Sequence, residues 1–257
     1  MKRELIKELR YALRSGRFLI LAAGFAFFSM MTPVMMKLVL PGVIKSQMPG
    51  LTDEVMTQMF HMTQIGCIQS YMGDVFEIGS LLVAFTLCGL MAQELKDNTL
   101  VLPLCSGRRL SQIVSGKMLV FGAALLALPT LALSLNYLYS GILFAFEIGY
   151  QPILLGGLMQ GLFMVFLLSG LLLFGSLLQR PVAAGMVTLG TAYAMSMVGG
   201  LLQINTWLPT GLMEAAQTLP VTLDASVLRT ALITAGLTIL FCAAALYRLH
   251  HQEWNRR

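Results

Sequence analysis

Charged residues are scarce in this sequence. Asp, Glu, Lys and Arg make up 11% of the 257 residues, whereas hydrophobic residues make up 57%. Because soluble domains carry about 25% charged residues, this composition excludes an ordinary soluble domain. Three long stretches, 118–146, 148–179 and 181–213, contain no Asp, Glu, Lys, Arg or His at all. Ion- and proton-coupled transporters usually place ionisable groups near the middle of the membrane, so these stretches argue against a secondary transporter.

Groups that perform catalysis or bind metals are also few. The only histidines are His61, His250 and His251, all outside the long apolar runs, and no HExxH motif occurs. The four cysteines are scattered without a CxxC pair, so we expect no disulfide within the chain. Residues 111–118 resemble the phosphate-binding GxxxxGK[ST] but lack its first glycine and its final hydroxyl. We therefore expect no catalytic site, no metal and no cofactor.

Hydrophobic segments of membrane-spanning length are abundant. Six long runs are free of Asp, Glu, Lys and Arg, and a spanning helix needs about 20 apolar residues. We predict an all-α polytopic membrane protein whose residues 1–257 form a single transmembrane domain. The predicted transmembrane helices are 18–40, 74–95, 114–139, 153–178, 183–205 and 227–247. The second run is the shortest, so its helix must extend past Glu77 or Glu94.

Lysine and arginine are distributed unevenly between the two predicted sides. Six of the 17 lie before span one, four between spans two and three, one between spans four and five, and three after span six. An excess of these residues marks the cytoplasmic side, so both termini are predicted to be cytoplasmic. The net charge of +5 is explained by residues that face the headgroups of the lipid bilayer, and no basic patch interleaved with aromatics indicates nucleic-acid binding.

Residues 2–17 are predicted to form an amphipathic helix in the membrane interface. Leu5, Leu9 and Leu13 share one face, and basic residues at spacings of three and four occupy the other. A solvated basic tail explains the same pattern equally well. Gly16 would form the corner into the first span.

Local signals mark the ends of the spans and the segments outside them. Pro33 predicts a kink in the first span, and Pro41 predicts the end of that span. Thr52, followed by two acidic residues, predicts the N-cap of a helix outside the membrane. A second short external helix is expected between Pro209 and Pro220.

Small residues four apart predict close packing between helices. Gly157 with Gly161 forms a GxxxG motif, and Ser196 with Gly200 forms a similar pair. Such pairs let helix backbones approach each other in lipid. They do not identify the neighbouring helix.

The longest charged interruption between hydrophobic segments runs from Glu94 to Lys117. Within it, Asn98 can take the left-handed conformation that ends a helix, and Thr99 can cap a new one. Pro103 would lie in the first turns, where its missing N–H costs least, and residues 106–107 would break the new helix. We predict a connecting loop over 96–113 that carries a short lateral helix on which another protein can act. A plain basic cytoplasmic loop is the alternative.

The connecting loop and its flanks resemble the loop after the second span of ABC-2-type permeases. These proteins are the membrane subunits of ABC exporters with the type V fold. The features that match are a glutamate, a Thr-Leu pair, a proline, a Ser-x-Arg and a Gly-Lys at the head of a span: Glu94, Thr99, Leu100, Pro103, Ser106, Arg108, Gly116 and Lys117. The family more often has glycine where this chain has Asn98, and the spacing leaves Arg108 and Arg109 as alternatives for one position.

The resemblance implies a permease subunit of an ATP-driven exporter in the bacterial plasma (inner) membrane. In the family, the loop holds a coupling helix that sits in a groove of the ATPase. Two permease chains would pair with two separate ATP-binding subunits, and this chain would have no ATPase site of its own. The uncharged spans favour a hydrophobic or amphipathic substrate such as a drug, a lipid or a peptide antibiotic. A non-transporting scaffold or sensor subunit would share all these features.

Overall fold

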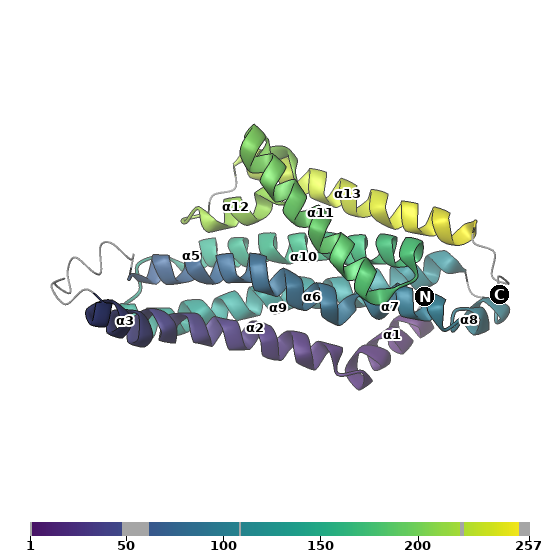
Figure 1. Ribbon diagram of the computed structural model, residues 1–257, viewed down its shortest axis with the longest axis horizontal. Coiled ribbons are helices and arrows are strands. Elements are labelled where there is room, and N and C mark those ends of the chain that lie inside the picture. Colours follow the sequence, from purple (N-terminus) through teal and green to yellow (C-terminus); the bar gives the residue numbers. More distant parts are fainter. Residues whose placement is uncertain (1, 48–61, 108, 222–223, 252–257) are drawn as a thin grey trace.

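Figure 1 shows a computed structural model of the chain, in which most helices lie along one long axis. The structure describes residues 2–47, 62–107, 109–221 and 224–251, and over these ranges every regular element is a helix. Six helical segments are long and apolar enough to cross a membrane: Arg17–Val43, Gln64–Lys96, Leu110–Phe144, Tyr150–Leu178, Pro181–Leu202 and Ala225–His250. The prediction of an all-α polytopic membrane protein is confirmed.

The N-terminal segment forms helix α1 (Lys2–Arg14), which turns sharply into α2 (Arg17–Val34). The turn is made at Gly16, whose φ of 70° lies in the left-handed region that glycine adopts without strain. Helix α1 packs against α2 and α9 (Leu110–Phe144). Its apolar face, which includes Leu9 and Leu13, is exposed on the protein. Such a face suits a helix that lies in a bilayer interface.

The first span continues further than predicted. A π-helical turn, η1 (Met35–Val39), follows α2 and begins two residues after Pro33, and α3 (Leu40–Gln47) follows it. Our expectation that Pro41 would end this helix was therefore wrong. A π turn leaves a carbonyl without its usual partner four residues on. Pro41, which has no N–H, can follow such a turn without losing a hydrogen bond.

The second span begins ten residues before the predicted position of 74. It consists of α5 (Gln64–Asp74), the π-helical η2 (Val75–Gly79), α6 (Ser80–Leu87) and α7 (Gly89–Lys96). The hydroxyl of Thr63 caps its start by accepting a hydrogen bond from the Gly66 N–H at 3.1 Å. Asp74 and Glu77, which interrupt the apolar run in the sequence, both lie within the helix. The predicted N-cap at Thr52 lies outside the described residues.

The remaining helices agree with the predicted spans to within a few residues. After the short α8 (Val101–Cys105) come α9, α10 (Tyr150–Leu178), α11 (Pro181–Leu202), the 3₁₀ turn η3 (Asn205–Trp207), α12 (Gly211–Gln217) and α13 (Ala225–His250). The short helix predicted between Pro209 and Pro220 is α12. Helices α1 and α8 and the C-terminal end of α13 lie at one end of the bundle, and α3 lies at the other (Figure 1).

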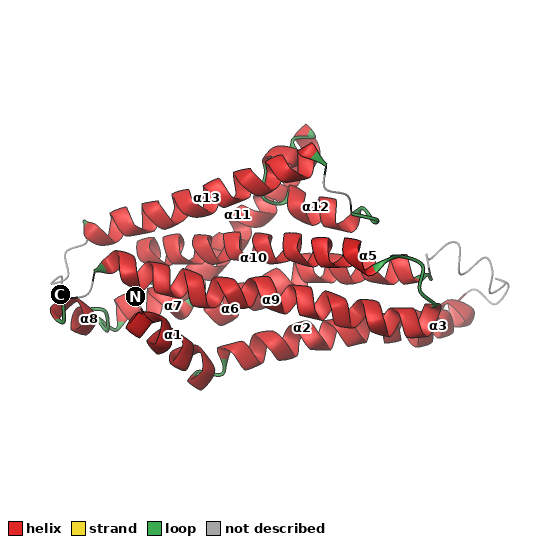
Figure 2. Ribbon diagram, turned by 180° about the vertical axis from the view of Figure 1, so that it is seen from behind, coloured by secondary structure: helices red, strands yellow, loops and turns green. Residues whose placement is uncertain are grey.

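Helix α10 is the centre of the bundle. It is the most buried of the six spanning segments, and it packs against α9, α13, α11, α7 and α12. Figure 2 shows it from behind, between α13 and α9. An uncharged helix that is apolar on all sides is typical of such a buried position.

The GxxxG motif in α10 packs directly against α9. A Cβ atom added at Gly157 would lie 2.8 Å from Cα of Thr130, and one added at Gly161 would lie 2.8 Å from Cα of Leu126. Both distances are too short for a side chain, so the predicted close packing is confirmed for this pair. A Cβ added at Gly200 would meet no atom within 4 Å. The second pair therefore makes no such contact at Gly200 within the described chain.

We predict that Gly161→Val lowers the stability of the bundle. The added side chain would collide with the backbone of α9, and overpacking of this kind costs about 1–3 kcal/mol. The measurement is the thermal unfolding midpoint of the detergent-purified protein. The matched control is Gly190→Val, because a Cβ there meets no atom within 4 Å. Equal midpoints for the two variants would contradict this packing of α9 on α10.

Candidate functional site

The connecting loop begins at a well-formed helix end. The N–H of Thr99 donates to the Glu94 carbonyl at 3.0 Å, and the N–H of Asn98 donates to the Leu95 carbonyl at 3.3 Å. Asn98 has a φ of 52°, so the predicted left-handed conformation is confirmed. These two bonds form a Schellman motif, with asparagine in the position that glycine most often holds. The motif fixes the direction in which the chain leaves α7.

Thr99 serves the helix before it rather than the helix after it. We expected its side chain to cap α8, but its hydroxyl donates to the Glu94 carbonyl at 3.3 Å. That carbonyl already accepts the Thr99 backbone N–H. The left-handed turn at Asn98 reverses the chain and brings the threonine back over the last turn of α7. Both bonds therefore hold the start of the loop to Glu94.

The predicted short helix exists and ends where expected. Pro103 is the third residue of α8 (Val101–Cys105), where no N–H is required. The Ser106 hydroxyl donates to the Pro103 carbonyl at 2.7 Å. Gly107, with a φ of 79°, turns the chain away. The loop is thus a compact unit with its own turn at each end.

Burial divides the connecting loop into an anchor and a tip. Leu100 is buried in the main hydrophobic cluster together with Leu95 and Leu110, which flank the loop. Cys105, Ser106, Gly107 and Arg109 are exposed. Arg108 lies outside the described residues, so the choice between it and Arg109 stays a prediction. The tip is a small, polar surface on a loop that is anchored by leucine.

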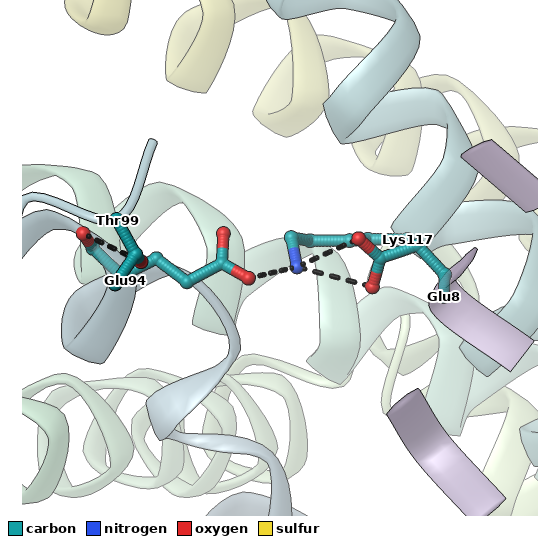
Figure 3. A network of polar contacts seen from close by, with 4 residues as sticks. All are labelled: Glu8, Glu94, Thr99 and Lys117. Atoms are coloured by element: carbon teal, nitrogen blue, oxygen red, sulfur yellow. Dashed lines mark hydrogen bonds and ion pairs between the residues drawn. The ribbon is translucent and has the colours of Figure 1, made fainter. Parts of the chain in front are cut away.

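Lys117 lies behind the loop and is completely buried. We expected Gly116 and Lys117 to mark the start of the third span, but α9 begins at Leu110, and Lys117 is two turns inside it. Its ammonium group lies 2.7 Å from Oε1 of Glu94 and 3.2 Å from Oε2 of Glu8. Figure 3 shows Lys117 between the two carboxylates, with Thr99 beside Glu94. We call Glu8, Glu94 and Lys117 the ion triad.

The ion triad connects three separate elements. Glu8 comes from α1, Glu94 from the helix before the loop and Lys117 from the helix after it. Glu8 and Lys117 have side chains 1% and 0% exposed, while Glu94 is 19% exposed. A buried ammonium is tolerated only when it is paired and hydrogen-bonded. The triad therefore opposes any separation of α1, α7 and α9.

A second cation lies next to the triad. The guanidinium carbon of Arg17 is 4.9 Å from the centre of the Tyr11 ring, and Nζ of Lys117 is 5.9 Å from the same centre. Aromatic rings attract cations at such distances. With both carboxylates and both cations ionised, the group carries no net charge. Tyr11 thus connects the triad to the start of α2.

Two polar atoms of this group lack hydrogen-bond partners. Nη1 of Arg17, a donor, and Oε2 of Glu94, an acceptor, are both buried and unpaired. Unpaired buried groups are costly, and each asks for an explanation. A donor and an acceptor left over in one cluster show that the observed arrangement does not use all of the available bonds.

Sequence reasoning identified Glu94 and Lys117 but not their common partner. Glu8, Tyr11 and Arg17 were assigned only to an amphipathic or basic segment. The available signal was the spacing of Glu8 and Ala12, which lie four residues apart on one face and are both buried. An acidic residue on the same helical face as a small residue indicates a contact with the protein rather than with headgroups.

Comparison with known proteins assigns no family. No protein-family model matches the chain, and no curated protein or solved structure gives a match. Within the described ranges, no three His, Cys, Asp or Glu side chains form a group that could hold a metal ion. The geometry of the connecting loop and of the ion triad is therefore the basis for a functional interpretation.

We predict that Lys117→Met strongly destabilises the protein. Removal of the ammonium leaves the carboxylates of Glu8 and Glu94 without it, and breaking a buried ion pair in this way costs about 3–5 kcal/mol. The free energy of unfolding in detergent, measured with denaturant, tests this. The matched control is Lys96→Met, since Lys96 is exposed near the end of α7 and its loss should cost less than about 0.5 kcal/mol.

A double variant that also neutralises Glu8 distinguishes the effect of charge on stability from the effect of packing. Glu8→Gln combined with Lys117→Met should recover part of the lost stability, because one uncompensated buried charge is removed. A double variant that is no more stable than Lys117→Met would argue against an ionic role for Glu8.

Proposed function

We propose that the chain is the membrane-spanning permease subunit of an ATP-driven exporter. Two such chains pair with two separate ATP-binding subunits in a bacterial plasma membrane, and the chain itself has no ATPase site. The transported substrate is hydrophobic or amphipathic. The observation that carries this proposal is the connecting loop, which presents an exposed tip and is tied through Glu94 to the helices on both of its sides.

Glu94 is the residue through which a force on the loop reaches the bundle. Its backbone carbonyl accepts both bonds from Thr99, and its side chain bonds to Lys117. A displacement of α8 therefore pulls on α7 directly and on α9 through the ion pair. Because Lys117 also bonds to Glu8, the N-terminal helix follows.

Two arrangements of these charges are required for a switch. In the observed arrangement, Oε2 of Glu94 and Nη1 of Arg17 are buried without partners. We propose that a shift of α7 relative to α1 and α2 gives these two atoms partners, and that these added hydrogen bonds stabilise a second state. The ATPase then needs only to bind one state better than the other in order to change their populations.

Cys105 offers a direct test of the partner. Among the described cysteines it is the exposed one, while Cys67 and Cys88 are buried and Cys242 is intermediate. We predict that a thiol-reactive photo-crosslinker on Cys105, in native membranes opened to the cytoplasmic side, forms a covalent adduct with an ATPase. Mass spectrometry of the adduct should identify a subunit with a Walker motif.

Two variants make this test specific. Cys105→Ser should abolish the adduct. Adding Ser46→Cys to that variant places an exposed thiol on α3, at the opposite end of the bundle, and should give no ATPase adduct. Labelling at Cys105 without any ATPase adduct, in membranes that retain the protein, would contradict the proposal and favour a scaffold or sensor subunit.

A further inference from the structure

A large cavity that is open to the surface lies at the end of the bundle away from the connecting loop, and Met31, Met35 and Ile78 in its wall are 40–44% exposed. Its volume is about 520 Å³, within the range of about 300–1,000 Å³ that is typical of ligand sites. It lies between the first spanning segment, α2 to α3, and the second, α5 to η2. Figure 1 shows these elements meeting at the end opposite to α8.

The wall of this cavity is apolar and adaptable. Met31, Met35 and Met36 contribute to it, together with the aromatic ring of Phe28 and several aliphatic side chains. Methionine has three rotatable bonds and a polarisable sulfur, so methionine-rich walls adjust to ligands of differing shape. Such a wall fits the hydrocarbon part of a ligand without requiring one shape.

One carboxylate interrupts this apolar wall. Asp74 lines the cavity, and its Oδ2 accepts a hydrogen bond from the Thr32 hydroxyl at 3.0 Å. Among the side chains that the structure describes, no Lys, Arg or His forms an ion pair with it. A carboxylate in an apolar site is costly unless a cation or several donors offset its charge. Among the described side chains, the one that donates a hydrogen bond to Asp74 is the hydroxyl of Thr32.

Lys37 is the basic residue nearest in sequence to the cavity residues, but its side chain contacts the end of α9. Lys37 belongs to η1, between the cavity residues Met36 and Val39. Its ammonium group donates to the Leu143 carbonyl at the end of α9 and lies 5.4 Å from the centre of the Phe144 ring. Cations are favoured at the C-terminal end of a helix. Lys37 therefore does not pair with Asp74.

Both helices that form the cavity are widened beside it. The π-helical turns η1 (Met35–Val39) and η2 (Val75–Gly79) both contribute lining residues, among them Met35 and Ile78. Such turns are rare and are found frequently at functional sites. Two of them on facing helices, next to one carboxylate, form a second indication of a binding site.

We infer that this cavity binds a small amphipathic organic cation. The positive group lies against Asp74, and the apolar part lies among the methionines. As a substrate site this rests on the proposed function, and it narrows the class of substrate from hydrophobic or amphipathic molecules to amphipathic cations. The binding step itself requires only the cavity and its carboxylate.

Two probes of almost the same size and opposite charge test this inference. Tetraphenylphosphonium and tetraphenylborate are titrated into the purified chain in nanodiscs of zwitterionic lipid, and binding to empty nanodiscs is subtracted. The phosphonium should bind saturably. Asp74→Asn should weaken its binding about tenfold, the effect of losing one charge-assisted contact, and should leave borate binding no weaker.

Three further variants distinguish the contributions of the Asp74 charge and of the cavity space to phosphonium binding from unspecific effects of substitution. Asp74→Glu keeps the charge and should retain binding of the phosphonium. Ser70→Phe keeps the carboxylate but fills part of the cavity, which Ser70 lines, and should weaken binding of the phosphonium. Glu214→Gln removes an exposed carboxylate on α12, which does not line the cavity, and should change binding less than about twofold.

The inference is overturned if the phosphonium binds equally well to the wild type, Asp74→Asn and Ser70→Phe. It is also overturned if tetraphenylborate, titrated alone, binds the wild type with the same affinity as the phosphonium. No ATPase is present in this measurement, so its failure would leave the Cys105 adduct as independent support for the proposed function. Binding without any Cys105 adduct would keep the cation site and remove its assignment to an ATP-driven exporter.

Discussion

The buried ammonium group of Lys117 is the constraint on which the loop end of the bundle depends. Its cost is offset only while Glu8 and Glu94 both remain within hydrogen-bonding distance. These carboxylates come from the N-terminal helix and from the helix before the connecting loop. Three elements that are distant in sequence therefore hold one another in place. Hydrophobic packing cannot supply this constraint, because lipid solvates an apolar helix surface as well as another helix does.

Away from the triad, close backbone contacts between helices stabilise the bundle. Gly157 and Gly161 bring α10 against the backbone of α9, and α10 in turn contacts most of the other spanning helices. Because dispersion falls steeply with distance, such contacts are strong only where small residues allow them. Gly200 faces open space in the single chain. Its helix α11 is thus held less tightly at that point.

The spans could be predicted from the sequence because lipid imposes a length and a composition on every crossing. Turn residues such as Gly16, Asn98 and Gly107 could also be predicted, since few residues adopt a positive φ. Side-chain pairings across the bundle could not be predicted. Glu8 was assigned to a basic segment, and Asp74 was placed at the first residue of the second span, because the sequence does not show that Lys117 and Thr32 supply their partners. Thr99 was assigned to the wrong helix for a similar reason.

Glu94 of the ion triad and the neighbouring Arg17 lie on the same two spanning segments as the cavity. Asp74 and Glu94 belong to Gln64–Lys96, and Thr32 and Arg17 belong to Arg17–Val43. At a rise of about 1.5 Å per residue, Asp74 and Glu94 are about 30 Å apart along the helix, roughly the thickness of a bilayer core. A shift that re-pairs Glu94 moves this segment relative to α2. Since η1 and η2 interrupt the α-helical bonding beside the cavity, we propose that bending concentrates there and that it changes the affinity of the proposed site for a cation.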